Sequence, residues 1–300
     1  MSQQKKDPAR TIGFVGLGVM GEPICRNLAE KCNQPVVAFD TRPEPLQRLA
    51  AAKVEPMPSV AAVAAAADVV FLSLPGAEEV RAVCLGPRGI LPVARQGQIV
   101  VDLSTCPVAT AREVAEGLAT KGVGFADAPV ARTREAAAKG TLSIMVGAAP
   151  EIYGRIAPLL GFMATDVTHC GPVGSGQLVK LMNNKILIQT VIAIAEALAI
   201  GGRFGIDRQL LLETLAKGSA DSFALRNHGM KAMLPGVFPE NAFSTRYALK
   251  DLGYALQVAE TCGVPVESAR LAQSLLDRSV EQGNGELYFP AVLKTFERQK

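Results

Sequence analysis

A chain of 300 residues with 49% hydrophobic and 20% charged residues is long enough to bury the cores of two globular domains. Its net charge of +3 excludes the concentrated basic field that nucleic-acid binding requires. The opening residues MSQQKKDPAR hold no apolar signal segment, and we expect no run apolar enough to cross a bilayer, so the sequence predicts a soluble, cytoplasmic protein without a membrane partner.

The first half of the chain alternates apolar, β-rich runs with alanine-rich helical stretches. The runs are nearly continuous in Val, Ile, Phe and Leu, as in a parallel sheet that is covered on both faces. They occupy 11–16, 35–40, 68–75, 98–104, 122–130 and 142–148, and the helical stretches 19–33, 43–52, 61–67, 76–85, 107–121 and 150–161. This alternation predicts right-handed βαβ units in a doubly wound Rossmann domain of the α/β class.

The pattern changes after Gly171, where helices replace the alternation and no strand pattern returns. A long apolar helix is expected over 177–203 as a link between domains. Amphipathic helices are expected at 207–217, 221–232, 244–262, 265–282 and 288–298. We therefore predict a Rossmann domain at 1–173 and an all-helical domain at 174–300.

The sequence offers no metal site or disulfide framework. The six cysteines are scattered without a C-x-x-C pair, which is typical of reduced, mostly buried thiols. The two histidines, His169 and His228, have no partner at metal-ligand spacing, so we expect structural or surface roles for them.

A glycine-rich turn follows the first strand and opens the first helix. Gly16, Gly18 and Gly21 form G-x-G-x-x-G with Val19 and Met20 between the last two. The first glycine makes the tight turn, the second lets a pyrophosphate approach the backbone, and the third lets the helix pack closely. The phosphates would lie at the positive end of the helix. This turn predicts a dinucleotide site.

Side chains after the later strands are expected to complete that site. Asp40 ends the second strand about twenty residues past the glycines, where a carboxylate accepts from the adenosine ribose and repels a 2′-phosphate. This favours NAD over NADP, although Arg42 lies close enough to turn toward a phosphate. Leu74, Pro75 and Thr105 are expected to flank the nicotinamide ribose at the carboxyl ends of their strands.

Three polar residues interrupt the long apolar helix. Lys180 and Asn184 are four residues apart and share a face, and Asn183 lies beside them. A partly desolvated ammonium can exchange a proton beside a carbon that exchanges hydride. The alternative is that Lys180 extends to solvent while the asparagines cap a turn.

Four ordered segments resemble those of the β-hydroxyacid dehydrogenase family, which includes 3-hydroxyisobutyrate dehydrogenase, over essentially the whole chain. They are GFVGLGVMGEPICRN at 13–27, DAPVARTREAAAKGTLSIMVG at 127–147, GSGQLVKLMNN at 174–184 and ALKDLGYAL at 248–256. The resemblance implies a Rossmann domain, a long interdomain helix and a helical C-terminal domain, assembled as a homodimer or homotetramer. It also implies that Lys180 is the catalytic acid/base, that Asn184 binds substrate beside Asn183, and that Lys250 reaches the nicotinamide end.

One segment departs from the family pattern. Where most members read D-x-P-V-S-G-G and bind a carboxylate, this chain has Ala131, Arg132 and Thr133 in the last three positions. A guanidinium fork and a hydroxyl suit an oxyanion with several oxygens. The pair resembles that of the sulfolactaldehyde reductases of the family, in which it binds a sulfonate, although a solvent-exposed arginine on a variable loop is an alternative. Lys185 is a further departure whose role the sequence leaves open.

These features lead to one hypothesis and two alternatives. We expect an NAD-dependent oxidoreductase that interconverts a small anionic β-hydroxyacid-type alcohol and its aldehyde, with reduction of 3-sulfolactaldehyde to 2,3-dihydroxypropane-1-sulfonate as the preferred reaction. The first alternative is a carboxylate substrate such as 3-hydroxyisobutyrate, tartronate semialdehyde or a 3-hydroxy amino acid. The second is a non-catalytic nucleotide-binding protein, which would have no use for Lys180.

Overall fold

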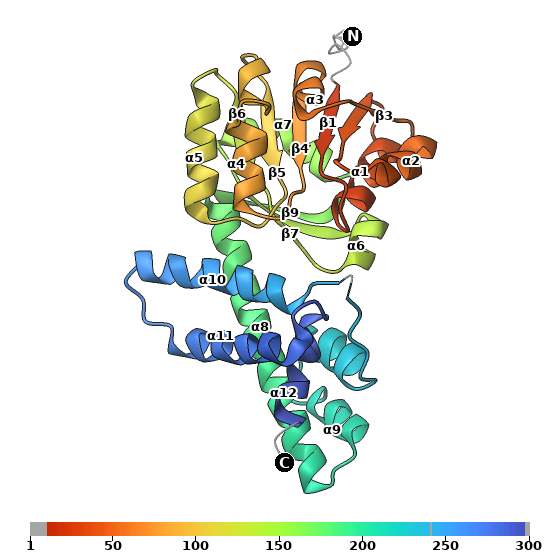
Figure 1. The fold of residues 1–300 in the computed structure, drawn as a ribbon, viewed down its shortest axis with the longest axis vertical. Coiled ribbons are helices and arrows are strands. Elements are labelled where there is room, and N and C mark those ends of the chain that lie inside the picture. Colours follow the sequence, from red (N-terminus) through yellow and green to blue (C-terminus); the bar gives the residue numbers. More distant parts are fainter. Residues whose placement is uncertain (1–10, 241, 298–300) are drawn as a thin grey trace, which may run out of the picture. The chain divides into compact units, whose positions relative to one another are not determined.

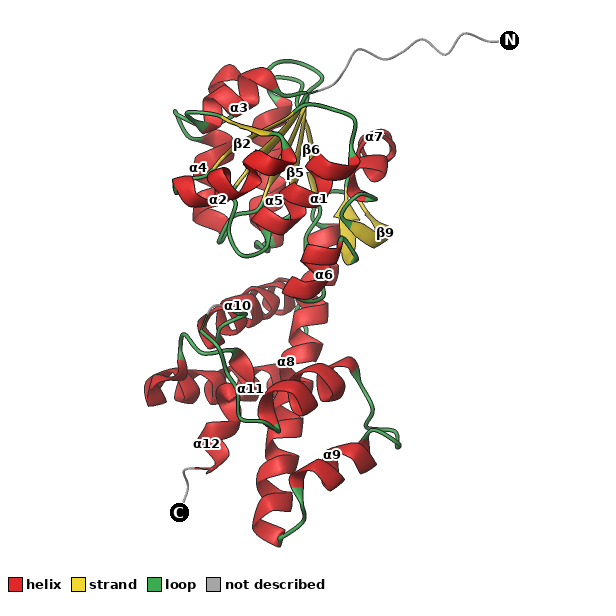
Figure 2. Cartoon of the chain, turned by 90° about the vertical axis from the view of Figure 1, so that its right-hand side faces the viewer, coloured by secondary structure: helices red, strands yellow, loops and turns green. Residues whose placement is uncertain are grey.

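A computed structural model of the chain describes residues 11–240 and 242–297. These residues form two compact units that divide after Lys180, seven residues beyond the boundary expected from the sequence. The first unit is a sheet flanked by helices and the second is helical, and the long helix α8 (Ser175–Phe204) begins in one and continues in the other (Figures 1 and 2).

The first unit is built on a single sheet in the order β3-β2-β1-β4-β5-β6-β8-β7, with β9 paired to β8. Strands β1 to β6 run parallel, as expected for a Rossmann domain. The far edge differs from the expected all-parallel sheet, because β8 runs antiparallel to β6 and β7. The strands are β1 (Ile12–Val15), β2 (Val36–Phe39), β3 (Val54–Pro56), β4 (Val69–Leu72), β5 (Ile99–Asp102), β6 (Gly124–Asp127), β7 (Val130–Ala131), β8 (Leu142–Gly147) and β9 (Ala164–Gly171).

Helices cover both faces of this sheet, which explains why its strands are apolar on both sides. On one face Phe14 packs in a core with Ile24 of α1, and on the other Val15 packs in a core with Val80 of α4 and Val114 of α5. The helices are α1 (Gly21–Lys31), α2 (Pro43–Leu49), α3 (Val60–Ala66), α4 (Ala77–Leu85), α5 (Val108–Ala119), α6 (Arg134–Lys139) and α7 (Pro150–Leu160), with short 3₁₀ turns at η1 (Ala50–Ala52) and η2 (Leu91–Val93).

The second unit packs its helices around α8. Ile188, Val191 and Leu198 of α8 share a core with Leu252 and Leu276. The helix expected over 221–232 is a π-helix that begins four residues later, and the one expected over 265–282 ends at Ser279 before a second π-helical segment. The elements are α9 (Arg208–Leu215), η3 (Leu225–Met233), α10 (Thr245–Thr261), α11 (Glu267–Ser279), η4 (Val280–Asn284), η5 (Phe289–Val292) and α12 (Leu293–Glu297).

The expectation that no helix could cross a bilayer is wrong for α8 on length and composition alone. An 18-residue window of α8 has a mean hydropathy of 1.6, which meets the usual requirement for a spanning helix. Core helices of soluble proteins meet the same requirement. Its buried residues Ile188, Val191 and Leu198 lie in the protein core of the second unit, and this accounts for much of its apolar character.

Candidate active site

The glycine turn has the geometry that a pyrophosphate needs. Gly16 has a φ of +91°, where a side chain would be strained, and a Cβ there would overlap the carbonyl oxygen of Ser73. A Cβ at Gly21 would overlap the Gly16 carbonyl oxygen, so α1 can begin at Gly21 only without a side chain. At Gly18 an added Cβ meets no atom within 4 Å, so this position faces open space. The residues therefore fit a dinucleotide at the N-terminus of α1.

Asp40 lies directly beside this turn, at the end of β2. Its Oδ2 accepts from the Leu17 N–H at 2.6 Å, and its Oδ1 accepts from the backbone N–H and Nε of Arg42 at 2.9 and 3.2 Å. Burial opposes ionisation, but the hydrogen bonds from Arg42 and Leu17 outweigh it and lower the pKa of Asp40. A carboxylate is thus held ionised where the adenosine ribose would lie, with the Arg42 guanidinium folded against it.

The loops after β4 and β5 meet at the carboxyl edge of the sheet. Leu74 and Thr105 are partly buried there, and Pro75 is exposed. The Leu74 N–H donates to Ser104 Oγ at 2.9 Å, which joins the two loops. The two loops follow neighbouring parallel strands and therefore lie at the carboxyl edge, where ligands of open α/β sheets bind.

Two carboxyl groups end adjacent strands beneath those loops. Asp102 of β5 and Asp127 of β6 are register partners, and neither is exposed to solvent. Burial, with a smaller contribution from the neighbouring Asp127 charge, raises the pKa of Asp102 to about 7 against the hydrogen bonds from Ser104. Burial also raises the pKa of Asp127 to about 6, against backbone hydrogen bonds from Gly174 and Gln177. These aspartates were not among the site residues predicted from the sequence, although each ends an apolar strand.

Asp127 places the start of α8, the helix that carries Lys180. Its Oδ1 accepts from the Gly174 N–H and its Oδ2 from the Gln177 N–H, both at 2.7 Å. The carboxylate therefore satisfies two of the N–H groups that a helix leaves unpaired at its start. Lys180 follows Gln177 by three residues and is partly buried within the first unit.

The second unit brings together the amide pair and the residues of α10. Asn184 is 3% exposed, and its Nδ2 donates to Asp251 Oδ2 at 2.7 Å. Its Oδ1 accepts from Asn183 Nδ2 at 3.0 Å. Because the Asn184 amide nitrogen has two protons, Asp251 orients the group and leaves one proton for a ligand. The asparagines do not cap a turn, since both lie inside α8.

Lys250 lies next to Asp251 on α10. Its Nζ is 3.4 Å from Asp251 Oδ1 and lies 5.0 Å from the ring centroid of Tyr247 and 5.5 Å from that of Tyr254. The ammonium is therefore held by one carboxylate and two aromatic faces. Lys185 lies elsewhere on α8, where its Nζ donates to Gln189 Oε1 at 2.9 Å.

Arg132 has an unusual backbone and an engaged side chain. Its φ is +84°, a conformation that glycine adopts without strain and that is uncommon for arginine. Its Nη1 donates to the Thr141 carbonyl and Thr165 Oγ1 at 2.7 and 2.8 Å, and its Nη2 to Asp166 Oδ2 at 2.7 Å. The Arg132 side chain is 40% exposed, and its guanidinium is bound to residues of β9 at the edge of the sheet.

The neighbours of Arg132 are also engaged in local structure. Ala131 is buried at the end of β7. Thr133 is the N-cap of α6, and its Oγ1 accepts from the Ala136 N–H at 3.3 Å. The threonine hydroxyl thus has a structural role in addition to any contact with a ligand.

The histidines have structural surroundings. The His169 ring stacks on Tyr153 with 4.5 Å between centroids, and its Nε2 lies 2.8 Å from the Ala148 carbonyl oxygen. His228 is buried, and the Tyr288 hydroxyl lies 2.6 Å from its Nδ1. Burial lowers the pKa of His228 to about 4, so it is neutral at physiological pH.

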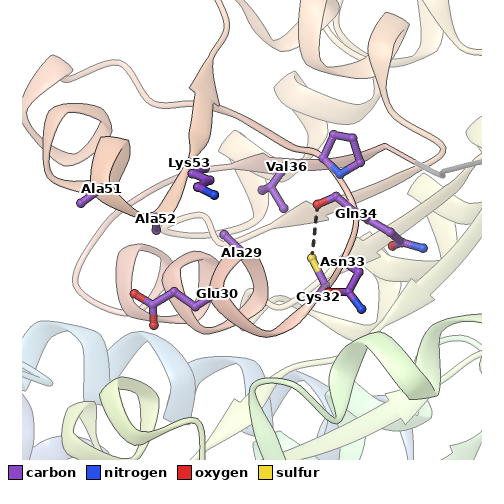
Figure 3. Close-up of a pocket in the computed structure, with 10 residues that line it drawn as sticks. Ala29, Glu30, Cys32, Asn33, Gln34, Val36, Ala51, Ala52 and Lys53 are labelled. Carbon is purple, nitrogen blue, oxygen red and sulfur yellow. Dashed lines mark hydrogen bonds between the residues drawn. The ribbon is translucent and has the colours of Figure 1, made fainter.

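A hollow of about 490 Å³ lies at the opposite end of the sheet (Figure 3). Its lining includes Cys32, Gln34 and Val36 at the start of β2, with Lys53 just before β3. This is the amino edge of the strands, whereas ligands of such sheets bind at the carboxyl edge. None of the site residues described above lines the hollow, so it is not the candidate active site.

Two family models match almost the whole described chain. Residues 11–171 match the NAD binding domain of 6-phosphogluconate dehydrogenase. Residues 174–296 match a domain described as NAD-binding of NADP-dependent 3-hydroxyisobutyrate dehydrogenase. The chain belongs to the β-hydroxyacid dehydrogenase family. Members of this dehydrogenase family act on CH–OH groups, and the predicted Rossmann fold is confirmed.

Known β-hydroxyacid dehydrogenases resemble the chain over nearly its full length. It is 33% identical to 2-(hydroxymethyl)glutarate dehydrogenase of Eubacterium barkeri, covering 96% of this chain and 95% of the relative. It is 32% identical to NAD-dependent L-serine dehydrogenase of Pseudomonas aeruginosa, covering 96% and 98%. The structure of Mycobacterium tuberculosis 3-hydroxyisobutyrate dehydrogenase with L-serine superposes with a TM-score of 0.85, at 32% identity and 95% and 98% coverage.

Proposed function

We propose that the protein is an NAD-dependent oxidoreductase that interconverts a small anionic β-hydroxyacid-type alcohol and its aldehyde. The observation that carries the proposal is the anchoring of α8 by Asp127, which ties the turn before Lys180 to the carboxyl edge of the sheet. The same unit holds the glycine turn and Asp40. A proton-transfer group and a nucleotide site are thus parts of one folded unit.

The proposed mechanism assigns one task to each group. The glycine turn and Asp40 would hold NADH, which when bound would supply the hydride that the carbonyl carbon accepts. Lys180 donates a proton to the developing alkoxide in reduction, and in oxidation the neutral amine removes it. Asn184 uses one amide proton for Asp251 and donates the other to the substrate oxygen. Asn183, which donates to the Asn184 carbonyl oxygen, lies beside it. Lys250 is assigned to the nicotinamide end.

Arg132 and Thr133 are assigned to the anionic tail of the substrate. Arg132 donates three of its five N–H groups to described residues, which leaves two for an oxyanion. This donor capacity supports 3-sulfolactaldehyde as the preferred substrate, with 2,3-dihydroxypropane-1-sulfonate as its product. The names of the relatives support the second candidate, a carboxylate such as 3-hydroxyisobutyrate or L-serine.

Initial-rate kinetics test the function and separate the two candidates. Sulfolactaldehyde, succinate semialdehyde and tartronate semialdehyde are compared with NADH and with NADPH. A kcat/KM for sulfolactaldehyde at least 10-fold above the others supports the sulfonate assignment, since 10-fold corresponds to about 1.4 kcal/mol. Higher values for a carboxylate reject that assignment but retain the dehydrogenase, and no NADH oxidation with any aldehyde rejects both.

Arg132→Gly is expected to lower kcat/KM for a sulfonate by about 10- to 100-fold, the usual value of charged hydrogen bonds, mainly through KM. Glycine suits the φ of +84°, so the variant removes the guanidinium without straining the loop. The measurement is steady-state kinetics with a sulfonate and a neutral aldehyde. Arg134→Ala, which removes a neighbouring exposed arginine, is the control. Equal losses for both aldehydes would reject the anchoring role.

NAD is the proposed cofactor because Asp40 is ionised beside the glycine turn. Asp40→Ser is expected to raise the ratio of kcat/KM for NADPH to that for NADH by roughly 10-fold or more, because it removes a charge that repels a 2′-phosphate and releases Arg42. Glu44→Gln, in the first turn of α2, controls for the lost charge. A wild-type preference for NADPH would contradict the assignment.

We further propose a cytoplasmic homodimer or homotetramer assembled through α8. Ile186, Ile200 and Phe204 are 63, 69 and 82% exposed and lie on one face of this helix. Ile200→Glu is expected to dissociate the assembly, because an unpaired charge in an apolar interface costs about 3 kcal/mol or more. Light scattering after size exclusion measures the mass, with Leu271→Glu on α11 as a similarly exposed control. A monomeric wild type would contradict the proposal.

A further inference from the structure

The first turn of α8 is tied to the sheet at more points than its N-cap requires. Beyond the two backbone bonds to Asp127, the Gln177 side chain forms a bridge to the loop after β5. Its Nε2 donates to the Ser104 carbonyl at 2.8 Å, and its Oε1 accepts from the Cys106 N–H at 3.0 Å. Gln177 has no exposed surface. A single amide thus spans the peptide units on either side of Thr105.

The approach of α8 to the sheet leaves little freedom in this turn. A Cβ at Gly176 would overlap the Met145 carbonyl oxygen and lie 2.8 Å from the Asp127 carbonyl oxygen. Ser104, which accepts the Gln177 amide, also accepts the Leu74 N–H through its hydroxyl. The loops after β4 and β5 and the start of α8 therefore form one hydrogen-bonded network within the first unit.

This network joins the two halves of the proposed chemistry. Thr105 and Leu74 belong to the loops assigned to the nicotinamide ribose, and Lys180 lies three residues after Gln177. In an α-helix residues three apart are neighbours on one face, so a shift of Gln177 moves Lys180 with it. A displacement of about 1 Å between reacting groups can cost on the order of 100-fold in rate.

We propose that Gln177 is a positioning residue, whose amide sets the distance between Lys180 and the Ser104–Cys106 loop. The proposal rests on the function assigned to Lys180 above. An amide is needed because one end donates to a carbonyl while the other accepts from an N–H. Methionine matches the length of glutamine but forms neither bond. Glutamate matches its shape and forms both bonds only when it is protonated.

Gln177→Met is expected to lower kcat about 10- to 100-fold with little change in the Kd for NADH, since the glycine turn and Asp40 are unaltered. Gln98→Met is the matched control. Gln98 is 3% exposed and its Nε2 also donates to backbone carbonyls, those of Ala64 and Ala67 at 2.6 Å, but it lies at the amino edge of β5. The Gln98→Met variant is expected to have a lower Tm than wild type and an unchanged kcat. Equal loss of kcat in both variants would overturn the proposal.

A double-mutant cycle tests whether Gln177 acts through Lys180. In a Lys180→Met background, Gln177→Met is expected to change the residual turnover by less than about 2-fold. Two independent losses that multiply would overturn the positioning role. If Lys180→Met is as active as wild type, the acid/base role assigned to Lys180 in the proposed function has failed instead, so the two failures are distinguishable.

Gln177→Glu provides a rescue that does not depend on the methionine variant folding. The measured quantity is the ratio of the kcat of Gln177→Glu to that of wild type at the same pH. This ratio is expected to rise toward one as the pH falls from about 9 to about 6, because the protonated carboxyl restores both hydrogen bonds. The carboxylate of Asp127, which accepts the backbone N–H of residue 177, favours this protonation while it is ionised. A ratio that does not vary with pH would overturn the proposal.

Discussion

Replacing Lys180 by methionine is expected to lower kcat about 10²- to 10⁴-fold, the usual contribution of a positioned acid or base. Methionine retains the length and apolar stem of lysine and keeps the second turn of α8 packed, but it cannot exchange a proton. The Kd for NADH is expected to stay within about 3-fold, a free-energy change of less than ~1 kcal/mol, because the glycine turn and Asp40 are unaltered.

The measurement combines single-turnover rates with NADH binding followed by fluorescence. Lys185→Met is a matched control, because it makes the same substitution on the same helix at a side chain that binds Gln189. It is expected to retain turnover. Near-normal kcat in Lys180→Met would show that another group transfers the proton. Loss of NADH binding would show that Lys180 acts on the cofactor instead.

Strands β1, β2, β4, β5 and β6 were predictable because helices cover the sheet on both sides. Every residue from Ile12 to Val15 is buried, so the segment is uniformly apolar and cannot be mistaken for a surface strand. The same reasoning missed β9, where Thr165, Asp166, Thr168 and His169 are exposed. This edge strand has no continuous apolar run. Its pairing with β8 depends on backbone hydrogen bonds, which the side-chain pattern does not reveal.

The π-helical segments show a different limit. The apolar period over 221–232 predicted a helix, and a helix is present at Leu225–Met233. Its wider hydrogen-bond spacing was not predictable, because side-chain periodicity reports which face is buried and does not report the backbone register. In η4 the change is marked by Gly283, whose φ of +87° interrupts the helix after α11.

Parts of the site were predictable where a residue type conflicts with its surroundings. Lys180 and Asn184 stood out as polar residues in an apolar helix, and Asp40 as a carboxylate at a fixed distance from the glycines. Gln177 and Asp127 did not stand out, because their partners lie 47 to 73 residues away in sequence. Their roles depend on tertiary contacts, so they could be assigned only from the structure.

Arg132 shows that the role of an unusual residue in a binding loop can be assigned only when its contacts are known. The sequence predicted that the guanidinium fork binds an oxyanion, and the structure pairs this guanidinium with Asp166 and Thr165. The backbone keeps the left-handed conformation that suits the glycine of the family pattern. Any oxyanion at this loop would therefore have to share the guanidinium with Asp166.

The stability of the first unit is expected to fall as the pH rises from about 4 to 8, and Asp102→Asn is expected to weaken this dependence. Burial raises the pKa of Asp102 from its usual 3.8 to about 7. Between these values the folded state keeps a proton that the unfolded state has lost, so raising the pH lowers the free energy of unfolding. One pKa unit corresponds to about 1.4 kcal/mol, so the loss amounts to a few kcal/mol by about pH 8.

Urea denaturation at about pH 4.5, 6 and 8 measures this effect as the difference between wild type and variant. The substituted amide does not titrate, so Asp102→Asn should gain stability relative to wild type at each step toward the highest pH. Asp68→Asn changes an exposed carboxylate paired with Arg95 and controls for the loss of one charge. A difference that stays constant with pH would mean that Asp102 is already ionised in the folded protein at the lowest pH. Asp102 would then carry a charge beneath the loops of the site at every pH tested, and the network around Ser104 would have to be stabilised by more than the hydrogen bonds described.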